Sequence, residues 1–283
     1  MRWAEIEVSA GPLAQELVAG LVSDLCGGAS LSGDGLAVTG WLPADDRAED
    51  RLLLLRSRLD ALPPEVSASP VEITVRPVED DGWLLAYREF FQPVTAGRFH
   101  IRPPWGEVAD DRSLVDLIID PGMAFGTGHH PTTRMMLEVL SEMPPAGLAV
   151  LDAGAGSAIL SVAAAKLGAA AVLAVEVDSS AEENALLNIR LNGVGDRVRF
   201  VLEDGPPEGE GPFDAAVMNI VADVIIALAP RVRQALRPDA WLACSGVIDS
   251  RLDEVTRALE ELRFEILEVR ESGEWRAIIC RRT

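Results

Sequence analysis

Residues 148–178 read LAVLDAGAGSAILSVAAAKLGAAAVLAVEVD, and this stretch decides the fold. The apolar run at 148–151 is typical of a strand buried on both faces of a parallel sheet, and the periodic stretch at 159–167 predicts a helix. Between them lie Gly154 and Gly156, where a backbone without Cβ can turn sharply and lie against a ligand. A second apolar strand follows the helix. The stretch therefore predicts half of a nucleotide-binding βαβ unit.

The second strand ends at Glu176, and the distance from Gly154 suits an acid that accepts hydrogen bonds from both ribose hydroxyls of a nucleotide. The third small position of the turn is Ala158 rather than glycine. A glycine turn of this kind also occurs as an ordinary strand-to-helix connection, so other stretches have to decide between the two readings.

The composition predicts a soluble globular protein of two domains. The 283 residues are 48% hydrophobic, and the chain contains no apolar run of the roughly 20 residues that a membrane span needs. The first ten residues, MRWAEIEVSA, lack the basic and then apolar pattern of a secretory signal, so we expect a cytoplasmic location. Cys26, Cys244 and Cys280 have neither metal-site nor disulfide spacing, and no metal is expected.

The formal net charge of -20 argues against direct contact with nucleic acid phosphates and favours a basic partner. General solubility explains the same acidity equally well.

Three regions are predicted along the chain. Residues 1–78 alternate strand, helix, strand, helix and strand, which predicts a small α+β ferredoxin-like domain, interpreted as a substrate-recognition module because it holds no cluster of catalytic residue types. Residues 79–116 are rich in aromatic side chains and are interpreted as a linker. Residues 117–283 alternate strands and helices and end in a hairpin, which predicts a parallel α/β sheet with one antiparallel strand near its edge.

The most specific stretch lies at 119–140 and reads IDPGMAFGTGHHPTTRMMLEVL. Pro131 and the threonines after it are typical of a helix start. That start does not explain Gly126 and Gly128, which together with Gly122 predict a mobile loop closing over a ligand at the carboxyl ends of the strands.

The segments DPGMAFGTGHHPTT, LDAGAGSAIL and MNIVAD (218–223) resemble PrmA, the bacterial family of methyltransferases of ribosomal large-subunit protein eleven. The resemblance covers nearly the whole chain. It implies a class I, Rossmann-like α/β fold with a seven-stranded, mostly parallel sheet that binds S-adenosylmethionine. It also implies methyl transfer to lysine side-chain and terminal amines of the ribosomal protein. We expect that protein as the partner, no direct nucleic acid or membrane partner, and a monomer.

The resemblance also implies site residues. The family's cofactor contacts fall on Thr133, Gly154, Glu176 and Asn219, and the neighbouring glycines Gly126, Gly128 and Gly156 are assigned to the same site. The family usually has aspartate where this chain has Glu176, and glycine where it has Ala158. Glutamate keeps the carboxylate, and alanine at the third small position is tolerated in related fingerprints, so weakened cofactor affinity is the expected consequence rather than its loss.

Asn219 is the predicted catalytic residue. Methyl transfer from a sulfonium needs a neutral amine aligned behind the methyl, and the side-chain carbonyl of Asn219 can accept an N–H bond from that amine. A lysine amine must first lose a proton, which desolvation favours. For His129 and His130 two roles stay open, relaying that proton or shaping the loop.

Three other functions compete with this reading. A class I methyltransferase could act on another protein lysine or a small amine. A nicotinamide-dependent oxidoreductase uses a similar glycine turn and acid, but the GTGHHPTT loop and the segment around Asn219 argue against it. A non-catalytic ribosome-associated binding factor would arise if Ala158 had removed cofactor affinity.

Overall fold

The computed structural model describes residues 3–9, 15–26, 29–31, 37–43, 48–60, 72–78, 91–122 and 126–283. The chain divides into two compact units, residues 1–92 and 93–283. The aromatic segment with Trp83, Tyr87 and Phe90, whose spacing predicts a helical face, lies outside the described residues. Residues 94–118, which the sequence places in the linker region or at its border, contribute three strands to the second unit.

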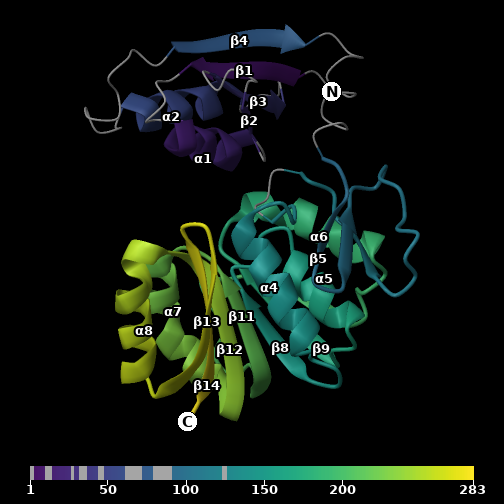
Figure 1. Cartoon of the computed structure of the whole chain (residues 1–283), viewed down its shortest axis with the longest axis vertical. Coiled ribbons are helices and arrows are strands. Elements are labelled where there is room, and N and C mark those ends of the chain that lie inside the picture. The colour runs from purple at the N-terminus through teal and green to yellow at the C-terminus, as the bar shows by residue number, and fades with distance from the viewer. Residues whose placement is uncertain are drawn as a thin grey trace. The chain divides into compact units, whose positions relative to one another are not determined.

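The first unit has the element order and sheet of a ferredoxin-like fold. Its elements are β1 (Trp3–Ser9), α1 (Gln15–Cys26), β2 (Ser30–Leu31), β3 (Ala37–Pro43), α2 (Ala48–Asp60) and β4 (Glu72–Val78). The strand order is β2-β3-β1-β4 with antiparallel pairs. Both helices lie on the same face of this sheet (Figure 1). The sequence predicts strand, helix, strand, helix and strand, and the two-residue strand β2 adds the fourth strand that completes the βαββαβ order of a ferredoxin-like fold.

A three-stranded sheet opens the second unit. Its strands are β5 (Val94–Ala96), β6 (Phe99–Arg102) and β7 (Val115–Ile118), with β5 and β6 antiparallel and β6 and β7 parallel. Phe99 is fully buried and packs into the main core of this unit. The glycine-rich segment that precedes α4 (Pro131–Glu142) therefore begins where β7 of this buried sheet ends.

The large sheet of the second unit has seven strands in the order β10-β9-β8-β11-β12-β14-β13. The strands are β8 (Ala149–Ala153), β9 (Ala171–Glu176), β10 (Val198–Leu202), β11 (Phe213–Asn219), β12 (Leu236–Ile248), β13 (Phe264–Ser272) and β14 (Trp275–Arg282). All neighbours are parallel except that β14 runs antiparallel to both β12 and β13. The predicted antiparallel strand is thus β14, one place inside the edge.

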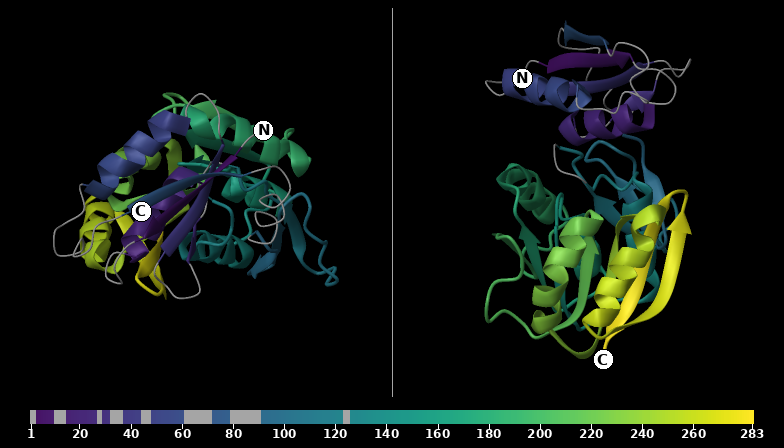
Figure 2. Two further views of the ribbon diagram at one scale, coloured as in Figure 1. Left: turned by 90° about the horizontal axis from the view of Figure 1, so that it is seen from above. Right: turned by 90° about the vertical axis from the view of Figure 1, so that its left-hand side faces the viewer.

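Helices cover both faces of this sheet, as buried parallel strands require. On one face lie α4, α5 (Ile159–Lys166) and α6 (Glu182–Leu191), and on the other lie α7 (Ala222–Ala235) and α8 (Leu252–Glu261) (Figures 1 and 2). Neighbouring residues of one strand enter different cores: Val150 of β8 packs with α4 and α5, whereas Leu151 packs with α7. Two apolar layers therefore fix the sheet from both sides.

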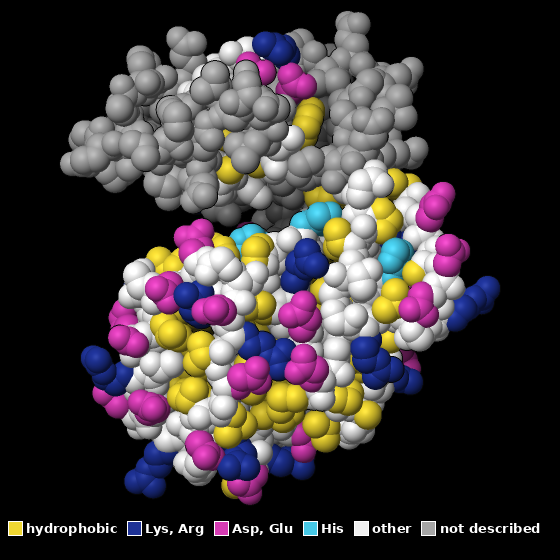
Figure 3. Space-filling view, viewed as in Figure 1, with side chains coloured by type: hydrophobic (Ala, Val, Ile, Leu, Met, Phe, Trp, Pro, Cys, Tyr) yellow, Lys and Arg dark blue, Asp and Glu magenta, His cyan; other side chains and the backbone are white. Residues whose placement is uncertain are grey.

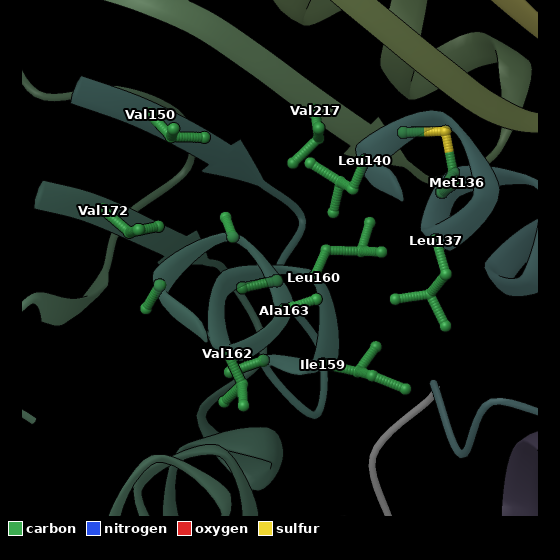
Figure 4. Close-up of a cluster of buried hydrophobic side chains, with 14 of the residues drawn as sticks. Met136, Leu137, Leu140, Val150, Ile159, Leu160, Val162, Ala163, Val172 and Val217 are labelled. Atoms are coloured by element: carbon green, nitrogen blue, oxygen red, sulfur yellow. The ribbon is translucent and has the colours of Figure 1, made fainter. Parts of the chain in front are cut away.

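The core between the sheet and α4 and α5 holds the site helices in place. Ile159 and Leu160 from the start of α5 pack with Leu137 of α4, and strand residues Val150 and Val217 complete the cluster (Figure 4). Every residue of α5 from 159 to 165 is buried, which explains why this helix is built of small and aliphatic residues throughout.

The surface shows a mixture of charges. In Figure 3, acidic and basic side chains of residues 93–283 alternate across the visible face. Several form ion pairs, such as Arg270 with Glu142 and Arg276 with Asp249. Within the described residues, no helix combines the length and apolar character needed to cross a membrane.

Candidate functional site

The turn between β8 and α5 has a backbone conformation that glycine adopts without strain. Gly154 and Gly156 have φ values of 84° and 52°, in the left-handed region that favours glycine. A Cβ on Gly154 would overlap the side chain of Ile220, which directly follows β11. The turn thus lies against the carboxyl end of β11. Ala158 also adopts left-handed angles, φ 62° and ψ 20°, and is fully buried. Its side chain therefore packs into the core.

Glu176 closes the turn from the end of β9. Its Oε2 accepts the N–H of Gly156 at 2.8 Å, and its Oε1 accepts the N–H groups of Val177 at 2.8 Å and Asp178 at 3.0 Å. Backbone donors therefore fix the carboxylate at the carboxyl ends of β8 and β9. A carboxylate has about four lone-pair directions, so this one keeps acceptor capacity for hydroxyl groups of a ligand.

Asn219 and Thr133 form the buried polar pair of the site. Asn219 ends β11 and is 9% exposed, and Thr133 lies in the first turn of α4 and is fully buried. The Nδ2 of Asn219 donates to Thr133 Oγ1 at 3.2 Å. The Oδ1 of Asn219 has no hydrogen-bond partner among the described residues. A buried acceptor without a partner is costly, and a ligand N–H would satisfy it.

The start of α4 carries its own cap. His130 is the N-cap residue, and its Nδ1 accepts the N–H of Thr132 at 3.4 Å and lies 2.7 Å from the Thr132 hydroxyl. Pro131 occupies the first turn, as predicted. The imidazole also packs edge to face on Trp275, with ring centroids 4.9 Å apart. Burial lowers the pKa of His130, which keeps the imidazole neutral and able to accept. Through these contacts His130 helps to shape the loop that leads into α4.

The two glycines before α4 lie against different neighbours. Gly126 is buried beside the turn of α5, because a Cβ there would lie 2.7 Å from Ser157 Oγ, and its carbonyl accepts that hydroxyl at 2.7 Å. Gly128 packs against β6 instead, where a Cβ would lie 2.9 Å from Ile101 Cγ2. Gly156 and Glu176 are therefore joined by a hydrogen bond, Gly126 lies against the same turn at Ser157, and Gly154 lies against Ile220, which directly follows the Asn219 of the Asn219–Thr133 pair.

A buried acid lies beneath the site. Asp152 in β8 is fully buried, and its Oδ2 accepts the hydroxyl of Ser161, in the first turn of α5, at 2.6 Å. Burial raises the pKa of Asp152 to about 7, and the nearby Glu176 charge adds to the effect, while the Ser161 hydrogen bond opposes it.

Sequence reasoning missed a polar network that joins the two glycine-rich segments. Asn184 and Asn188 lie on one face of α6, Asn192 follows at the same spacing as the C-cap residue of this helix, and Asn188 is fully buried. Their spacing of four residues is the signal that could have revealed them, because residues at i, i+4 and i+8 share a helix face. The hydrogen bonds of these asparagines and of Ser157 hold the backbone at Ile118, Asp120 and Gly126, and one of them reaches the turn before α5.

Comparison with known proteins agrees with this geometry. A family model described as ribosomal protein L11 methyltransferase (PrmA) matches residues 3–283. The ribosomal protein L11 methyltransferase of Pelotomaculum thermopropionicum is 35% identical over 99% of each chain. The enzyme of the same name from Heliobacterium modesticaldum is 40% identical over 87% of this chain and 78% of its own length.

One solved structure carries the same name. The ribosomal protein L11 methylase of Lactobacillus delbrueckii subsp. bulgaricus has 29% sequence identity and a TM-score of 0.64, covering 68% of this chain and 100% of that one. The seven-stranded sheet with its antiparallel β14 and the glycine turn after β8, which lies next to the central strand β11, are those of a class I fold. The chain therefore belongs to the ribosomal protein L11 methyltransferase (PrmA) family, and it is a class I methyltransferase that uses S-adenosylmethionine.

Proposed function

We propose that this chain methylates lysine side-chain and terminal amines of ribosomal protein L11, and that Asn219 aligns each amine. The observation that carries the proposal is the unpartnered, buried Oδ1 of Asn219, held by Thr133 at the carboxyl end of β11. The chain belongs to a family whose name states the acceptor protein. Carboxyl ends of parallel strands are where α/β folds of this class bind their ligands.

The residues of the α5 turn fit the cofactor. Gly154 and Gly156 leave the backbone bare, and Glu176 offers a carboxylate already oriented by three N–H groups. In the proposal, Glu176 accepts ribose hydroxyls, while Thr133 and Gly126 border the cofactor from the side of α4. When bound, S-adenosylmethionine supplies a methyl group on a positively charged sulfur.

Asn219 then acts on the acceptor amine. Its Oδ1 accepts one N–H of a neutral amine, which turns the nitrogen lone pair toward the methyl carbon. A bound S-adenosylmethionine would supply the methyl group and leave as the thioether, and the methylated ammonium would release its proton to solvent. Asn219 is held by its own Nδ2 bond to Thr133, so its carbonyl keeps one direction. Burial around the pair favours the neutral amine, because desolvation disfavours an ammonium.

The first unit is proposed to recognise the protein substrate. Its ferredoxin-like sheet and separate core support a self-contained module. The formal net charge of -20 suits a basic acceptor protein, and a ribosomal protein suits the cytoplasmic location expected from the sequence. We propose a monomer without direct nucleic acid contact as the active form.

Intact mass spectrometry of unmethylated ribosomal protein L11 tests the proposal. After incubation with the chain and S-adenosylmethionine, we expect mass gains in methyl steps, and tandem spectra that place them on lysine side chains and the terminal amine. Asn219→Ala should abolish most of the gain. Cofactor binding without any mass gain would refute the ribosomal acceptor and leave the methyltransferase reading with another amine. Absence of cofactor binding would favour the non-catalytic alternative.

A further inference from the structure

We propose that Asn188 and Ser157 are positioning residues of the cofactor site, which lock the glycine-rich segment before α4 onto the turn before α5. The inference deepens the proposed function and rests on it. Neither side chain belongs to the predicted contacts with cofactor or amine. Their place in the fold is between the two backbone segments that border the site.

Asn188 joins three backbone groups from one buried position on α6. Its Oδ1 accepts the N–H of Asp120 at 2.8 Å, and its Nδ2 donates to the carbonyl of Ser157 at 3.0 Å and lies 3.5 Å from the carbonyl of Asp120. Asp120 leads into the glycine-rich segment, and Ser157 belongs to the turn after β8. One amide therefore bridges the two segments, with both of its polar atoms occupied.

Ser157 completes the bridge from the other side. It is 1% exposed, and its hydroxyl donates to the carbonyl of Gly126 at 2.7 Å. Gly126 has φ 106°, and a Cβ at this position would lie 2.7 Å from the same hydroxyl. The close approach of these two segments thus depends on glycine on one side and on a small hydroxyl residue on the other.

The neighbouring asparagines show what is particular to Asn188. Asn184 donates to the carbonyl of Asp120 at 3.1 Å, and its side chain lies so close to Gly122 that a Cβ there would overlap it. Asn192 exchanges hydrogen bonds with the backbone of Ile118 in β7. Both hold the incoming chain, but among the three asparagines Asn188 is the one whose described bonds reach the turn of α5.

The expected consequence is on cofactor affinity. Without the bridge, the backbone at Asp120 and Gly126 can separate from the turn before α5, so the bound state must restore their alignment at a cost in binding free energy. Asn188→Ala should therefore raise the Kd for S-adenosylmethionine by about tenfold or more. The matched control is Asn192→Ala, which removes the same side chain from the same helix face and should change the Kd by less than about threefold.

Two milder variants separate the parts of the bridge. Asn188→Asp keeps an acceptor for the Asp120 N–H but loses the donor to the Ser157 carbonyl. Its Kd for S-adenosylmethionine should therefore be close to that of Asn188→Ala and not to that of the wild type. Ser157→Ala removes the hydroxyl that holds Gly126, and we expect the Kd to rise by roughly three- to tenfold. If Asn188→Ala does not fold, these two variants still carry the test.

The measurement is isothermal titration calorimetry with S-adenosylmethionine, beside thermal unfolding of each variant and amide hydrogen exchange of residues 126–128. The inference predicts faster exchange in that segment and weaker binding for Asn188→Ala, Asn188→Asp and Ser157→Ala but not for Asn192→Ala. Equal Kd values for Asn188→Ala and Asn192→Ala at equal loss of thermal stability would overturn it. A wild type that binds S-adenosylmethionine yet methylates no L11 would refute the acceptor and leave this result standing. A wild type without cofactor binding would overturn both.

Discussion

The helices α4 and α5 begin side by side at the site, but their first turns are completed in different ways. α4 is capped by its own His130 and opened by Pro131, so its first turn is satisfied locally and holds Thr133 in place. Among the described residues α5 has no side-chain cap, and a carboxylate 20 residues along the chain, Glu176, accepts the N–H of Gly156 in the turn before it. A locally capped helix is suited to hold Thr133 and, through it, Asn219 in place, whereas an uncapped start beside a glycine turn is suited to receive a ligand.

The largest expected effect is at the turn of α5. In Gly154→Ala the new Cβ would overlap Ile220, and we expect a loss of about 3 kcal/mol in the free energy of unfolding from overlap and left-handed strain together. Gly147→Ala is the matched control, because Gly147 has φ 76° and open space around it, so the loss there should be about 1 kcal/mol. Urea unfolding of both variants measures the difference. Equal losses would mean that close packing against Ile220 contributes nothing.

The two helix starts are expected to respond to pH in opposite directions. Asp152, bonded to Ser161 of α5, has a pKa of about 7 in the folded chain, above its unfolded value near 3.9. Its protonated form is favoured by folding, so this contribution is full below about pH 4 and is lost as the pH rises to about 7. Asp152→Asn should therefore gain stability relative to the wild type as the pH rises through that interval, by about 2 kcal/mol at about pH 5.5. Thermal unfolding from pH 4 to 8 measures the gap, and a constant gap would contradict the assignment.

At α4 the sign is reversed. Burial lowers the pKa of His130, so its contribution to stability is present above the ordinary histidine pKa and is lost as the pH falls through the lower folded value. His130→Ala removes the cap and should cost about 1 kcal/mol at pH 8. His130→Asn restores a capping oxygen and should recover part of that loss and remove the dependence on acid. The same unfolding series checks both, and an equal loss in the two variants would assign the effect to the Trp275 contact instead.

The smallest effect is expected at Ala158. Glycine there would relieve about 1 kcal/mol of left-handed strain, but it would also remove a buried methyl worth about 0.8 kcal/mol, so the two terms nearly cancel. Ala163→Gly, in the buried middle of α5, has no such relief and should cost more than 1 kcal/mol, about the sum of propensity and burial. Chemical unfolding of the pair distinguishes them, and equal losses would show that Ala158 is unstrained.

Much of the fold could be predicted because its signals are local. The apolar run at 213–219 predicts a strand, and β11 spans these residues, while Pro131 marks the start of α4. Less local features were missed. The apolar run that begins at Trp241 marks only the second part of β12, because pairing with β11 extends the strand back to Leu236 through Pro238, with a shift of register. The short strand β2 has two residues and exists through its pairing with β3.

The candidate site was predictable in its residue types and not in its contacts. Gly154 stands out because it follows the buried strand β8, and Glu176 and Asn219 because they end the buried strands β9 and β11. That Glu176 would accept the N–H of Gly156, or that Asn188 would reach Ser157 across 31 residues, depends on how α5 and α6 pack on the sheet. Such contacts are products of tertiary structure, and the spacing of residues along one chain does not contain them.

One paired measurement tests most directly whether the two helix starts have different roles. It compares Glu176→Gln, at the turn before α5, with Asn219→Ala, at the side chain held by α4. For each variant it gives the Kd for S-adenosylmethionine and the single-turnover rate of L11 methylation at saturating cofactor. We predict that Glu176→Gln raises the Kd by about tenfold and leaves the saturated rate within about threefold, because it acts where the ligand is held. Asn219→Ala should lower the rate by about a hundredfold and change the Kd by less than about threefold, because it acts where the amine is aligned. If both variants changed the same quantity, the separation of holding and aligning would be wrong.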